Sequence, residues 1–445
     1  MKEGKTLDLT TGTIWKVLLA FVLPILAGTL IQQLYTVVDA IVVGKFAGKA
    51  GLAAIDSVYT LFKFPLNFMS GLSAGATIVV SRQFGAGDEK RLSDSITSAF
   101  TIAISLGLLF SLIGALAAPG LIGLMSVPDE IRGQTLVYVR IYFGGLWTMT
   151  LYNMIAGILR AFGNSKSPLR ILIVCCVINI AGDLLLVGAF HMGVAGAAIA
   201  TVLSQLVSVI LALRALKKTH SAANHSGHHI NKRGIISMLS IGLPLALQSI
   251  LFPVANSIIQ AAINKMGTDI IAAWAVCGKL DMLIWFVADT MAPALSTYTA
   301  QNIGAGKKER VVKGNLTGLC FSVGTVAFIS ILLFLFPGPL GNLFITAQDT
   351  AVLSPMIVHF MRIMAPFYVF YAVAEAFSGA CCGMGDTVRP MIVTLLCTCG
   401  LRVLAIFLIL PHFGTMDCIV WIYVASWIAT GLAFIFMFMK KAKQL

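Results

Sequence analysis

An amide and a carboxylate interrupt a long apolar run of the sequence, CVINIAGDLLLVG, at residues 176–188. Asn179 and Asp183 are four residues apart, so they lie on one face of any helix that this segment forms. Charged side chains inside a membrane-spanning helix are energetically costly and are functional candidates by default. The question is therefore which other polar groups reach the same face.

Two further side chains, Asp39 and Thr201, reach a similar depth if the apolar runs are helices that cross a membrane in alternating directions. Gln32, Tyr35 and Asp39 repeat at spacings of three and four, which gives their helix one polar face. Two carboxylates, an amide, a hydroxyl and a phenol could thus converge. Hard oxygen ligands suit Na⁺, and two neighbouring carboxylates can also exchange a proton. The residue types leave both ions open, and a purely structural polar network is the alternative.

The composition indicates what kind of helices these are. Of the 445 residues, 58% are hydrophobic and 11% are charged, against about 25% charged in an ordinary soluble domain. The mean hydropathy is +0.93. A soluble fold could not bury so much apolar surface, so we predict an all-α polytopic membrane protein. The net charge of +13 is not gathered into a basic domain, which argues against nucleic-acid binding.

Twelve apolar stretches are long enough to cross a bilayer, which takes about 20 residues each. The predicted spans are 16–42, 54–80, 93–117, 134–158, 168–190, 193–216, 235–262, 270–298, 314–337, 354–379, 388–410 and 416–439.

An internal repeat divides these spans into two sets of six. The segment RQFGAGDEKR (82–91) recurs as QNIGAGKKER (301–310), and GNSKSP (163–168) recurs as GDTVRP (385–390). Even numbers of spans make the halves parallel repeats, related by a pseudo-two-fold axis along the membrane normal. Such halves typically enclose a site near the middle of the membrane and rock about it.

The repeat predicts an amino-terminal lobe (1–216), a linker (217–234) and a carboxy-terminal lobe (235–445). Most of the 31 Lys and Arg residues fall on one side of the membrane if both termini and the linker are cytoplasmic, as the positive-inside rule requires. The linker is rich in histidine, but no cysteine or acid there supports a metal site, and we interpret it as a solvated polar segment.

The sequence resembles the multidrug and toxic compound extrusion (MATE) family along its whole length. The resemblance rests on LTTGTIWKVLLAFVLPIL near the start, YTVVDAIVVGKFAG in the first span, the repeated GAG turns and the repeated G-N/D-S/T-x-x-P turns. It implies an exporter of lipophilic, often cationic small molecules that is driven by inward flow of Na⁺ or H⁺. We expect a monomer in the plasma membrane with no cofactor besides this coupling ion.

The resemblance also implies a cation site at four positions of this chain. They are Asp39, Asn179, Asp183 and Thr201. The fifth span looks like that of the DinF-like branch of the family. The second half has no acid at the repeat-related positions, so we expect the site in the amino-terminal lobe alone. The NorM branch has an acid shortly after the proline of span 7, whereas this chain has Gln248 in that region.

Other polar or kinking residues inside the spans are weaker candidates for cavity or gating roles. Pro24 could bend span 1, because proline removes a backbone donor. Glu375 could line the cavity. Asp281 and Arg402 lie at similar depth, and we expect them to pair because an isolated intramembrane charge is costly.

Two other functions remain as alternatives. A lipid-linked precursor flippase of the same superfamily would be expected to have extra spans and a cationic cavity, whereas bases are few in these spans. A membrane-embedded enzyme would need a cluster of metal ligands or a nucleophile beside a base, and the sequence shows no such cluster.

Overall fold

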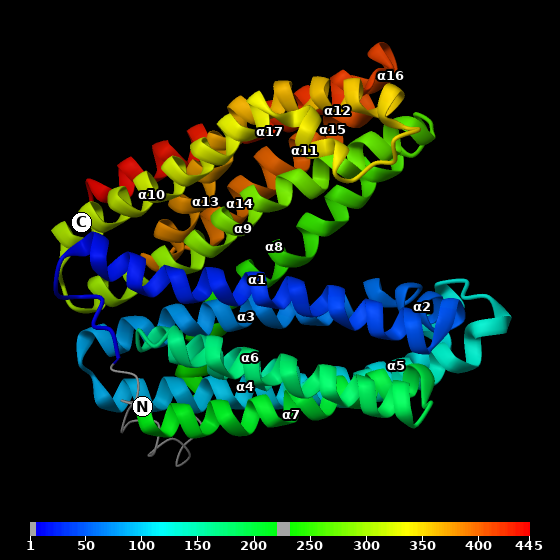
Figure 1. Ribbon diagram of the computed structural model, residues 1–445. Helices are drawn as coiled ribbons and strands as arrows, with labels where there is room; N and C mark the ends of the chain where they lie inside the picture. The colour runs from blue at the N-terminus through cyan, green and yellow to red at the C-terminus, as the bar shows by residue number, and fades with distance from the viewer. Residues whose placement is uncertain (1–5, 220–231) are drawn as a thin grey trace. The chain divides into compact units, whose positions relative to one another are not determined.

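The computed structural model describes residues 6–219 and 232–445, which are almost entirely helical (Figure 1). Eleven of the described helical segments are long and apolar enough to cross a membrane. The remaining predicted span, 134–158, lies within a helix of 33 residues that carries several charges near its start. The predicted all-α polytopic fold is confirmed. Most of the predicted linker, including its histidines, lies outside the described residues.

Two compact units divide the described chain. The first contains residues 6–9 and Ala20–Ala246, and the second contains Thr10–Leu19 and Leu247–Leu445. The chain therefore passes from one unit to the other after Leu9, and again within two helices, after Leu19 and after Ala246.

The helices of the first unit follow the predicted spans closely. They are α1 (Ile14–Phe46, from Ala20), α2 (Gly48–Asp56), α3 (Tyr59–Ala86), α4 (Glu89–Leu124), α5 (Asp129–Ala161), α6 (Lys166–Asp183), the π-helix η1 (Leu184–Ala189), α7 (Gly193–Thr219) and the first part of α8 (Lys232–Ile263). Helix α5 packs against α3, α4 and α7, and α7 packs against α6. Gly145 of α5 allows the close approach of α7, because a Cβ there would overlap the side chain of Val202.

The second unit repeats this plan with more interruptions. Its elements after α8 are α9 (Thr268–Gly304), α10 (Lys308–Leu335), α11 (Pro337–Asn342), α12 (Thr350–Met364), the 3₁₀ turn η3 (Ala365–Phe367), α13 (Tyr368–Gly383), α14 (Val388–Val393), the π-helix η4 (Thr394–Gly400), α15 (Leu401–Leu408), α16 (Leu410–Phe413) and α17 (Met416–Ala442). Pro366 lies in η3, where it cannot donate a helical hydrogen bond, and it divides the tenth predicted span into α12 and α13. Helix α13 packs against α9, α10 and α17.

The repeated G-N/D-S/T-x-x-P turns have the same geometry in both units. The glycine that opens each turn has a positive φ, 76° at Gly163 and 90° at Gly385. The side chains of Asn164 and Asp386 each accept a hydrogen bond from the backbone nitrogen three residues later, at 3.0 and 3.2 Å. The sequence repeat is thus also a repeat of local structure.

The segment before α1, residues 7–12, is held by side chains of the second unit, and we call it the strap. Arg310 Nη1 donates to the carbonyl oxygen of Gly12 at 2.7 Å, and Arg310 Nη2 donates to that of Thr11 at 2.6 Å. Lys307 Nζ donates to the carbonyl oxygen of Thr10 at 2.7 Å. These bonds satisfy carbonyls that no helix satisfies.

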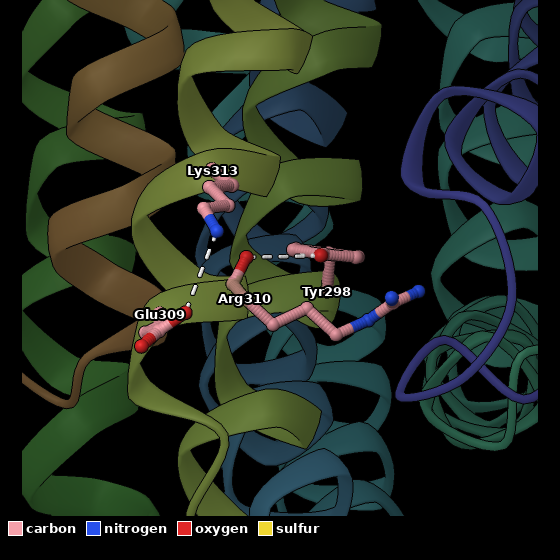
Figure 2. Close-up of polar contacts among 4 residues, drawn as sticks. All are labelled: Tyr298, Glu309, Arg310 and Lys313. Atoms are coloured by element: carbon pink, nitrogen blue, oxygen red, sulfur yellow. Dashed lines mark hydrogen bonds and ion pairs between the residues drawn. The ribbon is translucent and has the colours of Figure 1, made fainter.

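The side chain of Arg310 reaches the strap because its backbone is fixed from the other side. Figure 2 shows the Tyr298 hydroxyl donating to the Arg310 carbonyl at 3.0 Å, while Glu309 pairs with Lys313 at 3.4 Å. The guanidinium extends away from these contacts.

The strap also contacts the first unit, at its other end. The carbonyl group of Leu7 lies against Gly163 so closely that a Cβ on this glycine would overlap it. Leu9 is completely buried.

Candidate functional site

Helix α6 carries two of the predicted site residues near its end. Asn179 and Asp183 are both completely buried. The π-helix η1 begins directly after Asp183. Single π-helical turns are frequent at functional sites, because they change the direction of side chains relative to an α-helix.

The Asn179 amide connects α6 to α7. In one orientation of the amide, Asn179 Nδ2 donates to Thr201 Oγ1 at 3.4 Å. With the amide turned over, its nitrogen donates to Asp183 Oδ2 at 3.0 Å and its oxygen accepts from the Thr201 backbone nitrogen at 3.2 Å. Amide orientation is assigned from hydrogen bonding, and the second orientation satisfies both ends of the amide. Asn179 therefore joins Asp183 to Thr201.

Helix α1 brings the second carboxylate to the same place. The carboxyl group of Asp39 lies close enough to that of Asp183 for the two to interact directly. Asp39 Oδ1 and Asp183 Oδ1 are buried and receive no hydrogen bond from any described residue. Buried carboxylate oxygens are normally satisfied by a donor or a cation. The two oxygens are therefore free to accept a hydrogen bond or to contact a cation.

Hydroxyl groups complete one side of the site. The side chain of Tyr35 lies beside that of Thr201. Thr201 Oγ1 itself donates to the carbonyl oxygen of Ala197 at 2.9 Å, so its lone pairs face Tyr35 and the amide. The structure thus brings together Asp39, Asn179, Asp183, Thr201 and Tyr35, all within the first unit.

Two weaker candidates on α1 lie away from these ligands. Gln32 is exposed. Pro24 lies inside the helix, about 22 Å along its axis from Asp39 at the helical rise of 1.5 Å per residue. Any influence of Pro24 on the site must therefore pass through the shape of α1.

Two tyrosines of α5 were not predicted. Tyr138 and Tyr142 both lie close enough to Asp39 to interact with it electrostatically. Tyr142 also packs on Phe62, with ring centres 4.1 Å apart. Their spacing of four residues within an apolar span is the sequence signal that could have identified them.

The site has the chemistry of a monovalent cation or a proton. It offers two carboxylates, and the described residues contain no group of three or more His, Cys, Asp or Glu side chains that could hold a metal ion. Transition-metal sites usually need such a group. Neutral oxygens and two carboxylates instead suit Na⁺, or a proton shared between the two acids.

The expected pairing of Asp281 with Arg402 is wrong. Asp281 on α9 accepts a hydrogen bond from the Tyr368 hydroxyl of α13. Among the described residues, no basic group comes within ion-pairing distance of its carboxylate. Arg402 Nε on α15 donates instead to Ser426 Oγ of α17, at 2.7 Å. The two residues lie at similar depth but face different helices.

A second pair of acids lies further along the same two helices. Asp289 is exposed, and its Oδ1 accepts a hydrogen bond from the Tyr371 hydroxyl at 3.1 Å. Glu375, one turn further along α13, is half-buried and close enough to Asp289 to interact with it electrostatically. Trp285 packs edge-on against Tyr371 with ring centres 4.3 Å apart. This face of the second unit is acidic and aromatic.

The described helices are those of a polytopic membrane protein, and its first unit carries two neighbouring carboxylates, Asp39 and Asp183. The MatE family model matches residues 24–185 and 244–408, and the chain belongs to this family.

Known proteins resemble the chain over most of its length. It is 25% identical to the probable multidrug resistance protein YoeA of Bacillus subtilis over 446 residues, covering 97% of this chain and 96% of that protein. It is 27% identical to the FAD transporter of Shewanella oneidensis over 348 residues, covering 76% of each. A solved outward-facing structure of a multidrug resistance MATE family transporter of the MOP superfamily superposes with a TM-score of 0.89. The sequence identity is 20%, and the superposition covers 100% of this chain and 99% of that one, so the likeness shows the fold.

Proposed function

We propose that this chain is an antiporter that exports lipophilic, cationic small molecules in exchange for inward H⁺ or Na⁺. The observation that carries this proposal is the proximity of the Asp39 and Asp183 carboxyl groups, each of which retains a buried oxygen that no described residue donates to. Such a pair is unfavourable when both acids are ionised and no cation is bound between them. A proton or a sodium ion removes the repulsion, so ion binding and the conformation of α1 are coupled.

The coupling acts through the three helices that supply ligands. Asp39 lies on α1, Asp183 on α6 and Thr201 on α7. When the ion leaves, the carboxylates repel each other and α1 can move away from α6. Pro24 is the natural hinge for this movement, because its ring removes one helical hydrogen bond. Rocking of two lobes in the plasma membrane, with both termini cytoplasmic, would then expose the ion and substrate sites alternately.

The acidic and aromatic face of the second unit supports a cationic substrate. Asp289 and Glu375 supply negative charge, and Trp285 and Tyr371 supply ring faces, which attract cations. Several relatives are named multidrug resistance proteins, as YoeA is. The relative named an FAD transporter makes an anionic substrate the competing expectation, together with the lipid-linked precursors of a flippase.

Transport in proteoliposomes tests the proposal. The purified protein would be reconstituted with a cationic dye, FAD or a lipid-linked pyrophosphate, and a Na⁺ or pH gradient would be imposed separately. We expect dye movement to depend on one of the two gradients and to collapse when an ionophore dissipates it. Gradient-driven movement of FAD or of the lipid alone, without dye movement, would overturn the substrate assignment. Dye movement that is independent of both gradients would overturn the antiport mechanism.

A further inference from the structure

The Arg402 guanidinium is buried in the second unit with little to neutralise it. Its side chain is 1% exposed. Its Nε donates to Ser426 Oγ at 2.7 Å, and that hydroxyl donates in turn to the carbonyl oxygen of Tyr423 at 2.6 Å. The guanidinium carbon lies 4.1 Å from the ring centre of Tyr423 and 5.9 Å from that of Trp427. These ring faces attract the cation but do not cancel its charge.

The described part of the chain supplies no anion for Arg402. No carboxylate of residues 6–219 and 232–445 lies within ion-pairing distance of it, and Asp281 is held by Tyr368. Arg402 Nη2 is buried and donates to no described acceptor. The indole nitrogen of Trp427, a side chain only 2% exposed, is also buried without an acceptor. A buried charge that lacks a partner is among the costliest features a fold can contain.

The two units differ in charge at corresponding places. Ser426 and Tyr423 each lie 222 positions after Ser204 and Thr201. The same bond recurs, since Ser204 Oγ donates to the Thr201 carbonyl oxygen at 2.8 Å. In the first unit this part of the fold holds two carboxylates with open oxygens. In the second it holds a cation with open N–H groups.

We propose that the second unit binds a small monovalent anion, chloride under ordinary conditions, between Arg402 and Trp427. Arg402 Nη2 and Trp427 Nε1 donate to it, and both belong to one packed cluster in which Trp427 is also flanked by Tyr368 and Tyr423. Burial excludes a bulky substrate group. A water molecule would accept the two hydrogen bonds but would leave the charge of Arg402 uncompensated.

Thermal unfolding of the full-length protein in detergent tests this site. The sodium concentration and ionic strength would be held constant while chloride or bromide replaces gluconate, which is too large to enter. We expect Tm to rise by a few degrees with chloride and to saturate, because a ligand of the folded state alone stabilises that state. Bromide should act similarly, and bromide-soaked crystals should show anomalous scattering beside Arg402.

Two variants and one control locate the effect. Arg402→Met should abolish the dependence of Tm on chloride. Trp427→Phe keeps an aromatic ring and removes the N–H, so it should weaken the apparent chloride affinity by about tenfold. Arg389→Met, which changes an arginine with a 70% exposed side chain on α14, should retain the wild-type response.

The proposal fails if wild-type Tm is the same in chloride and gluconate, or if Arg402→Met responds to chloride as the wild type does. If Arg402→Met does not fold, the chloride response of Trp427→Phe and the bromide-soaked crystals test the anion site instead. An unchanged chloride affinity in Trp427→Phe, or a water molecule without anomalous signal beside Arg402, would show that the cluster holds water only.

Discussion

Arg310 holds the backbone of Gly12, almost three hundred residues earlier in the chain, through a 2.7 Å hydrogen bond to its carbonyl oxygen. The internal repeat allows this contact to be compared with the equivalent position of the first unit. In the first unit Arg91 occupies the position of Arg310, and it pairs with Asp88 at 3.3 Å. In the second unit Lys307 replaces Asp88, and both bases bind the strap.

Loss of this contact should loosen the strap. We expect Arg310→Ala to raise the rate at which a thiol reagent labels a cysteine introduced at Thr11, measured in everted vesicles on a Cys-free background. The reason is that two hydrogen bonds to charged donors disappear. The matched control is Arg91→Ala, which removes the corresponding arginine of the first unit and should leave labelling unchanged. Equal labelling in Arg310→Ala and wild type would show that Lys307 alone fixes the strap.

Replacement of either site carboxylate should stop coupled transport. Asp39→Asn and Asp183→Asn preserve shape and most hydrogen bonds, but an amide can neither release a proton nor balance a cation. We expect each variant to fold and insert, yet to lose gradient-driven efflux by at least about tenfold. Asp129→Asn, at an acid whose side chain is 95% exposed, is the control. Efflux at wild-type rates in both variants would reduce the site to a structural polar network.

The neutral ligands should contribute less and should report which ion is bound. Asn179→Ala and Thr201→Ala each remove one uncharged ligand while both carboxylates remain. If Na⁺ is the coupling ion, efflux should require a higher Na⁺ concentration. If H⁺ is the coupling ion, the pH dependence of efflux should shift instead. The measurement is initial efflux rate against each ion, and a rate unchanged in both would place these residues outside the site.

Gly163 should tolerate a side chain less well than Gly87, another glycine with a positive φ. Gly163→Ala forces a positive φ on alanine and also pushes Cβ into the Leu7 carbonyl group. Gly87→Ala is a matched control, because Gly87 has a φ of 67° and open space around it. The backbone cost alone is about 1 kcal/mol, so Gly87→Ala should lower Tm modestly and Gly163→Ala clearly more. Similar values of Tm would mean that the strap moves aside easily.

Pro24 should matter for transport more than for folding. Pro24→Ala restores a backbone donor in the middle of α1 and should stiffen it. We expect normal expression and Tm but slower gradient-driven efflux. Pro65→Ala, in α3, tests whether any membrane proline has this effect. Full efflux by Pro24→Ala would exclude a hinge at this residue.

The sequence predicted the helices, and the polar side chains that meet in the first unit, better than it predicted the pairing of Asp281 with Arg402. Hydropathy places a residue along a helix, and spacings of three and four place it on a face, which suffices for Asn179 and Asp183. Neither property gives the rotation of one helix against another. Asp281 and Arg402 therefore have the expected depth, but one faces α13 and the other faces α17. The sequence did not predict Tyr138 and Tyr142 near Asp39 for a related reason. Aromatic residues on an apolar helix are typical of residues that only pack against other helices.

The strap also bears on how a duplicated chain becomes asymmetric. A duplication yields two GAG turns, whereas the strap is a single segment before α1. With Asp88 in the first turn and Lys307 in the second, a reversal of charge three residues before the repeated arginine helps to distinguish the two turns. A protein assembled from two copies of the first half would carry the positions of Asp39 and Asp183 twice, yet neither copy would offer Lys307 to bind the strap. Divergence of the two copies thus leaves Lys307 and Arg310 to bind the strap.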